Sequence, residues 1–357
     1  MAVKSLAVKY RPKTFDDVSE QSAVKTILTQ QLVNKETKNA YLFCGGAGTG
    51  KTTCARIFAQ EINEHMGNPI EMDAASNNSV DDVREIIQQA KTKSLDSEYK
   101  VFIIDECHAL SNTAWQAMLK LIEEPPAKSI FIFCTTDPQK IPKTILSRVQ
   151  RYDFQRISQQ GIANRLTEII KRENDTICDE HGNDFCPGEW EQFGIEVSDD
   201  AIDYIAKIAD GGMRDAITLL DKCLAFKNIL TLEDVVAALG TTDYDTLFRL
   251  TEAMLNKAVD EVVRIIEEIH MSGKDLKQFV KTYIAFILDV CKFDVTSSFQ
   301  YLQMPSTYEE KLSKYSADDV EFCQDLLTAL IKLNADIKWE TSPKVMIEST
   351  LMLRAIK

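Results

Sequence analysis

The stretch that decides the fold is Gly45-Gly46-Ala47-Gly48-Thr49-Gly50-Lys51-Thr52, which directly follows the apolar run Ala40-Tyr41-Leu42-Phe43-Cys44. It matches the pattern G-x-x-x-x-G-K-[ST] between a predicted strand and a predicted helix, the context that this pattern requires. Glycines let backbone N–H groups close around phosphates, and the helix N-terminus adds a positive dipole end. We expect residues 45–53, Thr53 included, to bind a nucleotide, with Lys51 at the β- and γ-phosphates and Thr52 on Mg²⁺. The alternative is a glycine-rich turn with an accidental lysine, which chance gives in roughly 1% of such chains.

A second element places two carboxylates at the end of a buried strand. Val101-Phe102-Ile103-Ile104 is an apolar run, and Asp105-Glu106 follows it. Ligands of parallel sheets bind at the carboxyl ends of the strands, so both side chains are expected beside the phosphate-binding loop. Asp105 is suited to hold Mg²⁺, directly or through water, and Glu106 to act as general base on an attacking water. Taken alone, the pattern would also fit a strand that ends in a polar turn.

Up to residue 157 the sequence alternates between short β-rich runs and helical stripes, which predicts a mainly parallel sheet covered on both faces. The expected strands are Ala40–Cys44, Ile70–Asp73, Lys100–Ile104, Ser129–Cys134 and Gln150–Phe154. Beyond that point the 3.6-residue period dominates. We therefore expect an α/β domain over 1–157, a helical domain over 158–240 with an insertion near 174–192, and a second all-helical domain over 241–357.

Composition excludes several classes of protein. The 357 residues are 45% hydrophobic and 27% charged, which is typical of folded domains and not of disordered chains. The net charge of −14 argues against a general coat of nucleic acid or a polybasic membrane binder. No apolar run is long enough for a membrane span and no secretory signal is recognised, so we expect a cytoplasmic protein with reduced, mostly buried cysteines.

Further motifs carry a resemblance. Five further motifs occur before and after the glycine-rich loop and Asp105-Glu106. In chain order they are Lys9-Tyr10-Arg11-Pro12, Leu121-Ile122-Glu123-Glu124-Pro125-Pro126, Thr135-Thr136-Asp137-Pro138-Gln139-Lys140, Ser147-Arg148 and Gly212-Met213-Arg214-Asp215. The set resembles AAA+ ATPases, and more narrowly the bacterial clamp loaders, the gamma/tau subunits of DNA polymerase III. Because the phosphate-loop motifs are shared by very many NTPases, the combination of the other motifs makes the resemblance specific.

The resemblance implies roles for several residues. Thr136 matches sensor 1, Arg148 the arginine finger offered to a neighbouring subunit, and Arg214 the sensor 2 arginine of the lid. Tyr10, Arg11, Pro12 and Val18 match the adenine pocket. The implied activity is ATP hydrolysis with Mg²⁺. The region after residue 240 resembles the collar through which the subunits of the family assemble.

Two departures from the family pattern concern metals. Where a four-cysteine zinc module is common in the family, residues 63–69 contain no cysteine, so no zinc is expected there. The insertion near 174–192 contains Cys178, His181 and Cys186, with Asp184 as a conceivable fourth ligand. A metal site and an ordinary loop both remain open for it, the loop being favoured because no clean fourth ligand is present. The resemblance also implies a short, gamma-like form that lacks the tau extension.

The partners implied by the resemblance are other clamp-loader subunits in a hetero-oligomeric ring or spiral, a sliding clamp, and primer–template DNA without sequence specificity. Residues 1–60 carry nine Lys/Arg and four Asp/Glu, a net +5, which leaves −19 for the remainder. Arg84, off the apolar stripe of its helix, is the candidate phosphate contact, although a solvated helix charge would look the same. No membrane partner is expected.

Three functions from different classes are compatible with this reading. The first is an ATP-hydrolysing clamp-loader subunit, without a polymerase site of its own. The second is an ATP-binding scaffold subunit of the same assembly with little turnover, and the intact Lys51, Asp105, Glu106 and Arg148 disfavour it. The third is another AAA+ motor, such as a branch-migration helicase or a protein unfoldase, which the Pro-Gln-Lys and Ser-Arg motifs disfavour.

Overall fold

A computed structural model describes residues 5–94, 96–181, 194–239, 244–273, 275–305, 308–337 and 342–356, with only the backbone of 178–181. By its internal contacts the chain divides into two compact units. Unit 1 comprises 1–171 and 209–221, and unit 2 comprises 172–208 and 222–357. Two of the three boundaries fall inside helices, α7 (Gln159–His181) and α10 (Met213–Leu224), and the third follows the last residue of α9 (Asp199–Ile208). The division into three domains that the sequence predicts, over 1–157, 158–240 and 241–357, remains a proposal.

Unit 1 is built on the parallel sheet that the alternating pattern predicts. Its five strands lie in the order β2-β3-β4-β1-β5, and all four pairings are parallel. The strands are β1 (Ala40–Gly45), β2 (Ile70–Asp73), β3 (Lys100–Asp105), β4 (Ser129–Thr135) and β5 (Gln150–Phe154). β1 lies between β4 and β5 and is therefore an inner strand. The glycine-rich loop begins at its carboxyl end, between the carboxyl ends of those two strands. The predicted α/β fold class is confirmed.

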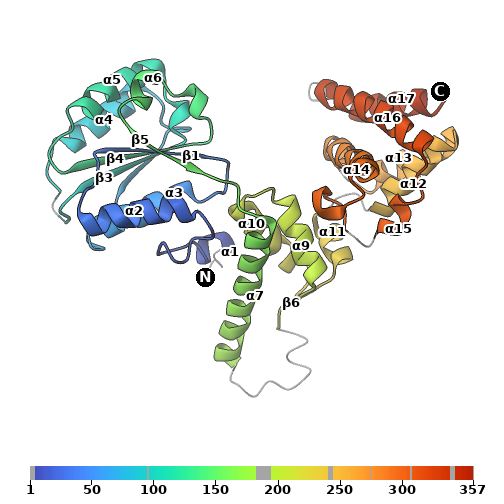
Figure 1. Cartoon of the computed structure of the whole chain (residues 1–357), viewed down its shortest axis with the longest axis horizontal. Helices are drawn as coiled ribbons and strands as arrows, with labels where there is room; N and C mark the ends of the chain where they lie inside the picture. Colours follow the sequence, from blue (N-terminus) through green and yellow to red (C-terminus); the bar gives the residue numbers. More distant parts are fainter. Residues whose placement is uncertain are drawn as a thin grey trace. The chain divides into compact units, whose positions relative to one another are not determined.

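Helices cover both faces of this sheet (Figure 1). On one face α2 (Ser22–Asn34) and α3 (Lys51–Ile62) pack with Tyr41, Phe43 and Ile132 in one apolar cluster. On the other face α4 (Val80–Ala90) and α5 (Asn112–Glu123) pack with Leu42, Phe102 and Phe131. Alternate residues of the strands point to opposite faces, so that most positions of the inner strands β1, β3 and β4 are buried. The remaining helices of unit 1 are α1 (Leu6–Lys9), η1 (Cys107–Ala109), η2 (Pro138–Lys140) and α6 (Lys143–Leu146).

Local signals in the sequence set the helix ends. Ser79 caps α4 in a capping box with Asp82, and Ser111 caps α5 by accepting from Ala114 N–H. Helix α5 ends at Glu123, directly before Glu124-Pro125-Pro126, because proline disfavours a helical residue in front of it. Gly211, at φ 82°, takes the left-handed conformation before α10 begins.

Unit 2 is helical apart from one short parallel pair, β6 (Glu196–Val197) and β7 (Ile229–Leu230), which the sequence reading missed. Two-residue strands carry too short a pattern to be recognised from periodicity. Helices α9 (Asp199–Ile208) and α11 (Leu232–Leu239) contact each other next to this pair. Asn174 closes the base of the insertion, because its side-chain amide exchanges two 2.8 Å hydrogen bonds with the backbone of Ile195.

The rest of unit 2 surrounds a single apolar core. Its helices are α12 (Tyr244–Leu255), α13 (Val259–Met271), α14 (Leu276–Thr296), η3 (Phe299–Tyr301), α15 (Glu309–Leu312), α16 (Ala317–Asp336) and α17 (Pro343–Ala355). Phe248, Tyr283 and Phe286 are among the largest fully buried side chains of this core. The helical pattern expected beyond residue 157 is found here, with long helices over 244–255, 259–271 and 276–296.

Candidate nucleotide-binding site

The glycine-rich loop joins the carboxyl end of β1 to the N-terminus of α3, as its motif predicts. Gly48 and Gly50 have φ values of 69° and 100°, a backbone region that side chains rarely adopt. Thr49 is 1% exposed, and its hydroxyl donates to the carbonyl of Gly46 at 2.9 Å. The loop is therefore held by its own sequence in a tight turn that leads into a helix of 12 residues.

Lys51 is the first residue of α3 and is buried despite its charge. Its ammonium donates to the carbonyl oxygens of Gly45 and Gly46, at 2.9 and 2.6 Å. Burial lowers the pKa of this ammonium, while the neighbouring Glu106 and Asp105 act in the opposite direction. A buried cation at the N-terminus of a helix is an arrangement suited to attract a polyanion.

The two carboxylates lie where the sequence predicts them, at the carboxyl end of β3. Thr52 Oγ1 donates to Asp105 Oδ2 at 2.8 Å, which brings together two oxygen ligands of the kind that Mg²⁺ prefers. Thr136 Oγ1 donates to Glu106 Oε2 at 3.0 Å, so the strand next to β3 contributes a hydroxyl to the predicted base. Glu106 itself has a φ of 47°, a left-handed conformation that is uncommon for a side-chain-bearing residue.

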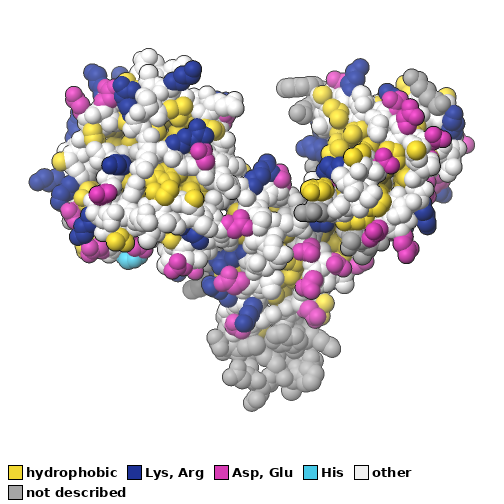
Figure 2. All heavy atoms as spheres, viewed as in Figure 1, with side chains coloured by type: hydrophobic (Ala, Val, Ile, Leu, Met, Phe, Trp, Pro, Cys, Tyr) yellow, Lys and Arg dark blue, Asp and Glu magenta, His cyan; other side chains and the backbone are white. Residues whose placement is uncertain are grey.

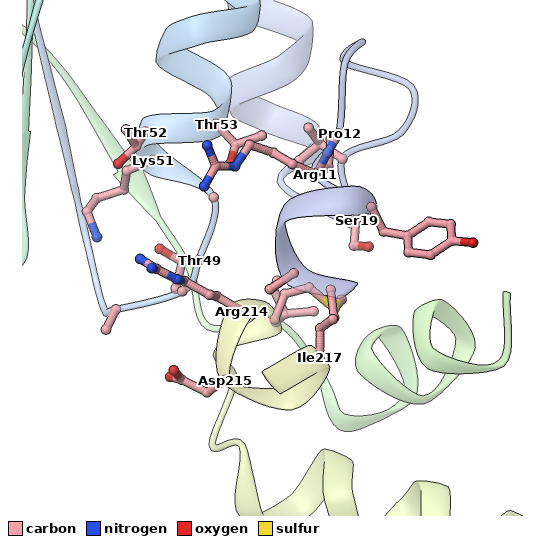
Figure 3. A pocket seen from close by; sticks show the side chains of 18 of the residues that line it. Arg11, Pro12, Ser19, Thr49, Lys51, Thr52, Thr53, Arg214, Asp215 and Ile217 are labelled. Carbon is pink, nitrogen blue, oxygen red and sulfur yellow. The ribbon is translucent and has the colours of Figure 1, made fainter. Parts of the chain in front are cut away.

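The start of α10 packs directly against the glycine-rich loop. Met213 N–H donates to Gly48 O at 3.0 Å, and a Cβ on Gly48 would lie 3.0 Å from Gly212 Cα. This close approach explains why glycine stands at both positions. Figure 3 shows Arg214 extending from α10 toward Thr49, while Arg11 extends toward Thr53 at the start of α3. Sequence segments some 160 residues apart thus meet at one site within unit 1, since Gly48 and Arg214 approach each other there.

A cavity of about 340 Å³ joins these elements. Of the residues predicted for nucleotide binding or hydrolysis, those that line it are Tyr10, Arg11, Pro12, Val18, Ala47, Gly48, Thr49, Gly50, Lys51, Thr52, Thr53, Asp105, Glu106 and Arg214. Gly45, Gly46 and Thr136 are not among the residues that line it. Gly45 packs against β5, where an added Cβ would lie 2.6 Å from Phe154 O.

Two predicted arginines lie elsewhere on unit 1. Arg148, after α6, forms an ion pair with Glu123 at 2.8 Å and donates to Thr144 O at 2.8 Å. It does not line the cavity of its own chain. Arg84 on α4 pairs with Asp81 at 2.7 Å, and its side chain is 66% exposed. Figure 2 shows basic and acidic side chains mixed over the face in view.

Three further polar residues at the site were missed by the sequence reading. Arg165 on α7 is buried, lines the cavity, and donates to the carbonyl of Tyr10 at 3.2 Å. Arg56, one turn along α3, lines the cavity and makes a bidentate pair with Glu71. The buried Gln21 amide joins the backbone of Gln155 to Thr49 O. Only the arginine at 165 carried a signal, because it interrupts the apolar stripe of its helix.

The predictions about metals and membranes concern mostly other parts of the chain. Cys178, His181 and Cys186 of the insertion, with Asp184, lie outside the residues whose side chains the structure describes. Among the described side chains, no three His, Cys, Asp or Glu residues gather as a metal site would need. Asn63 in the bridge over 63–69 instead binds the backbone of Tyr99. Within the described ranges, none of the helices has the length and apolar character of a membrane span.

Family models match three successive parts of the chain. Residues 64–158 match "DNA polymerase III, delta subunit", 190–228 match "DNA polymerase III clamp loader subunit, ATPase lid domain", and 230–356 match "DNA polymerase III subunits gamma and tau domain III". The DNA polymerase III subunit tau of Bacillus subtilis is 32% identical over 98% of this chain and 62% of its own length. The Escherichia coli subunit tau is 32% identical over 76% of this chain and 43% of its own length.

The chain thus spans less than two thirds of these curated relatives. Among solved structures, the RuvB Holliday junction branch migration motor of Thermotoga maritima aligns with a TM-score of 0.50 and 20% identity, over 69% of this chain and 79% of that one. At that identity the likeness concerns the fold alone, which is that of an AAA+ ATPase domain followed by a helical lid. The three matched models and the relatives agree with the motif set around the cavity: the chain belongs to the clamp-loader family of the DNA polymerase III gamma and tau subunits.

Proposed function

We propose that the chain is an ATP-hydrolysing clamp-loader subunit, which opens a sliding clamp and loads it onto primed DNA during replication in the cytoplasm. The observation that carries the proposal is the cavity of about 340 Å³ in unit 1. It joins the phosphate-binding loop, both carboxylates and Arg214 in a chain of the clamp-loader family.

The residues of the cavity fit ATP with Mg²⁺. The left-handed glycines 48 and 50, the N-terminus of α3 and the buried ammonium of Lys51 together suit a triphosphate. Thr52 Oγ1 and Asp105 Oδ2 supply hard oxygen ligands 2.8 Å apart for the metal. When bound, Mg²⁺ would neutralise charge on the transferred phosphoryl group. Tyr10, Arg11, Pro12 and Val18, which also line the cavity, would hold the base.

Hydrolysis would depend on the polar groups that face one another at the ends of β3 and β4. Glu106 would accept a proton from the attacking water, and Thr136, bound to Glu106 Oε2, would place both. Arg214 would contact the nucleotide from the lid. Because Arg148 lies outside its own cavity, we assign it to the ATP of a neighbouring subunit. A chain by itself would then hydrolyse ATP slowly.

The proposed partners are other clamp-loader subunits, a sliding clamp and primer–template DNA. The helical region over 244–356 would supply the contacts between subunits, and Arg84 a contact to DNA phosphate. An Arg84–Asp81 pair at the surface is weak, so that a phosphate would compete for the guanidinium.

The test is the rate of ATP hydrolysis by the chain alone, in a reconstituted loader, with a bacterial sliding clamp, and with clamp plus primed DNA. We expect the rate to rise at each addition and to be lost in Lys51→Ala. ATP binding without turnover under every condition would instead identify a scaffold subunit. A rate of ATP hydrolysis that does not change when clamp and primed DNA are added would contradict clamp loading, and the chain would still be an ATPase.

A further inference from the structure

His108 faces the predicted general base from the short helix η1 that follows β3. Its Nδ1 lies 3.2 Å from Glu106 Oε2 and 3.2 Å from Thr135 Oγ1. The side chain is 21% exposed, so that it is largely shielded from water. The sequence predicts no role for His108, because its approach to Glu106 depends on the turn of η1 after β3.

The chemistry of the neighbours fixes the proton on Nδ1. A bare Nδ1 would turn its lone pair toward a carboxylate oxygen only 3.2 Å away, which is repulsive. With a proton on Nδ1, the ring donates to Glu106 Oε2, whether it is neutral or charged. Thr135 Oγ1 already accepts the N–H of Asp137 at 3.0 Å, and it can accept a share of the same imidazole proton.

The two side chains that donate to Glu106 therefore bind the same carboxylate oxygen. Thr136 Oγ1 and His108 Nδ1 lie 3.0 and 3.2 Å from Oε2. Among the described residues we find no hydrogen bond to Oε1. The carboxylate is thereby fixed through one oxygen and lines the cavity, while the other remains available to accept a proton.

We propose that His108 is a positioning residue for hydrolysis, which together with Thr136 orients the Glu106 carboxylate toward the attacking water. The proposal rests on the proposed ATPase function. It assigns to His108 no contact with the nucleotide, so its loss should lower kcat and leave KM and ATP affinity unchanged. Because a displacement of a reacting group by about 1 Å can cost 10²-fold, we expect a loss of about 10- to 100-fold in kcat for His108→Leu.

Two polar variants test the position of the donor. In His108→Asn the side-chain amide can stand near the place of Nδ1, whereas in His108→Gln it reaches further, toward the place of Nε2. We expect Asn to restore most of the rate and Gln to restore little. Equal rates for the two, or a faster Gln variant, would overturn the proposal even if His108→Leu fails to fold. His65→Leu is the matched control, because His65 pairs with Glu61 at 3.5 Å on the surface and should not change the rate.

A double variant distinguishes a positioning role of His108 from a structural one, when His108→Leu is introduced into the Glu106→Gln protein. If His108 acts only through Glu106, His108→Leu should lower the residual single-turnover rate of Glu106→Gln by no more than about twofold, because coupled residues are not additive. A full additional loss would show that His108 supports the fold rather than the base. A wild-type chain that binds no ATP would refute the proposed function itself, whereas normal wild-type turnover matched by His108→Leu would refute this inference alone.

Discussion

The ATPase part of unit 1 and the helical region over 244–356 bury polar groups for different purposes. In unit 1 the buried side chains of Lys51, Thr49 and Arg165 line one cavity, and the buried Gln21 donates to the carbonyl of Thr49 behind it. In the helical region, one apolar core is built from helices α12 to α17, and the buried polar side chains found in its described part are Thr251 and Asp289.

The difference shows where each region can tolerate change. Thr251 donates to Leu247 O, and Asp289 accepts from the backbone N–H groups of Gln303 and Met304 at 2.7 and 2.8 Å. These two polar groups bind the backbone of a helix and of a loop, and neither lines the cavity of unit 1. We therefore expect substitutions in unit 1 to change chemistry, and substitutions in the helical region to change stability.

The largest expected effect is that of Arg148→Ala in the assembled loader. If Arg148 completes the site of a neighbouring subunit, the stimulated rate of ATP hydrolysis should fall by about 10³–10⁵-fold, while ATP affinity stays unchanged. Arg151→Ala is the matched control, because Arg151 is likewise an exposed arginine paired with an acidic residue. Stimulation that persists in Arg148→Ala would remove the trans role.

Glu106→Gln should lower kcat by about 10²–10⁴-fold, since the amide cannot accept the proton of the attacking water. The affinity for ATP should remain, because Lys51, Thr52 and Asp105 are intact. Equilibrium binding of a fluorescent ATP analogue and single-turnover hydrolysis would measure the two quantities separately. A parallel loss of binding would mean that Glu106 supports the cavity and not the chemistry.

Phe248→Ala should destabilise unit 2 by about 3–5 kcal/mol, because it removes a large buried ring from the core of the helical region. ATP binding by unit 1 should be unaffected. Calorimetric unfolding with and without ATP would detect the change, and Leu353→Ala, at an exposed position of α17, serves as the control. Loss of ATP binding in Phe248→Ala would break the separation of the two regions.

Asp289 offers a smaller effect that depends on pH. Desolvation by burial raises the pKa of its carboxyl, although the N–H groups of Met304 and Gln303 oppose the shift. A raised pKa in the folded state means that this carboxyl costs stability as pH rises from the unfolded value through the folded one. The difference in thermal midpoint, Asp289→Asn minus wild type, should therefore become more positive as pH rises. Asp289→Ala, which leaves both N–H groups without an acceptor, should lose about 1–3 kcal/mol.

The smallest effect is expected at the surface. Arg84→Ala should weaken binding of primed DNA by the loader only a few-fold, equally for all sequences, and reduce the slope of affinity against salt concentration by about one. Lys128→Ala is the control, because it removes another exposed cation of unit 1, one that is paired with Glu98. An unchanged salt dependence would leave Arg84 as a solvated helix charge.

Much of unit 1 could be predicted from local patterns. All five strands were placed within one residue of their observed ends, because β-rich apolar runs alternate with glycine, proline and helical stripes. The phosphate-binding loop and Asp105-Glu106 were recognisable because the chemistry is carried by neighbours in sequence. Local patterns could not predict the pairing of β6 with β7, nor the contacts of Arg165 and Gln21. These depend on residues far apart in the chain.

The sequence by itself determined the fold class, the family, and the helix ends that carry a local signal, such as those of α5, because these follow from periodicity, capping residues and motifs of adjacent positions. Only the tertiary structure decided that the segment around Tyr10, the loop at Gly48 and the helix at Arg214 line one cavity. It also decided that Thr136 and His108 bind the same oxygen of Glu106. The physical reason is that hydrogen bonds act over about 3 Å in space, and separation along the chain does not limit which residues folding brings that close.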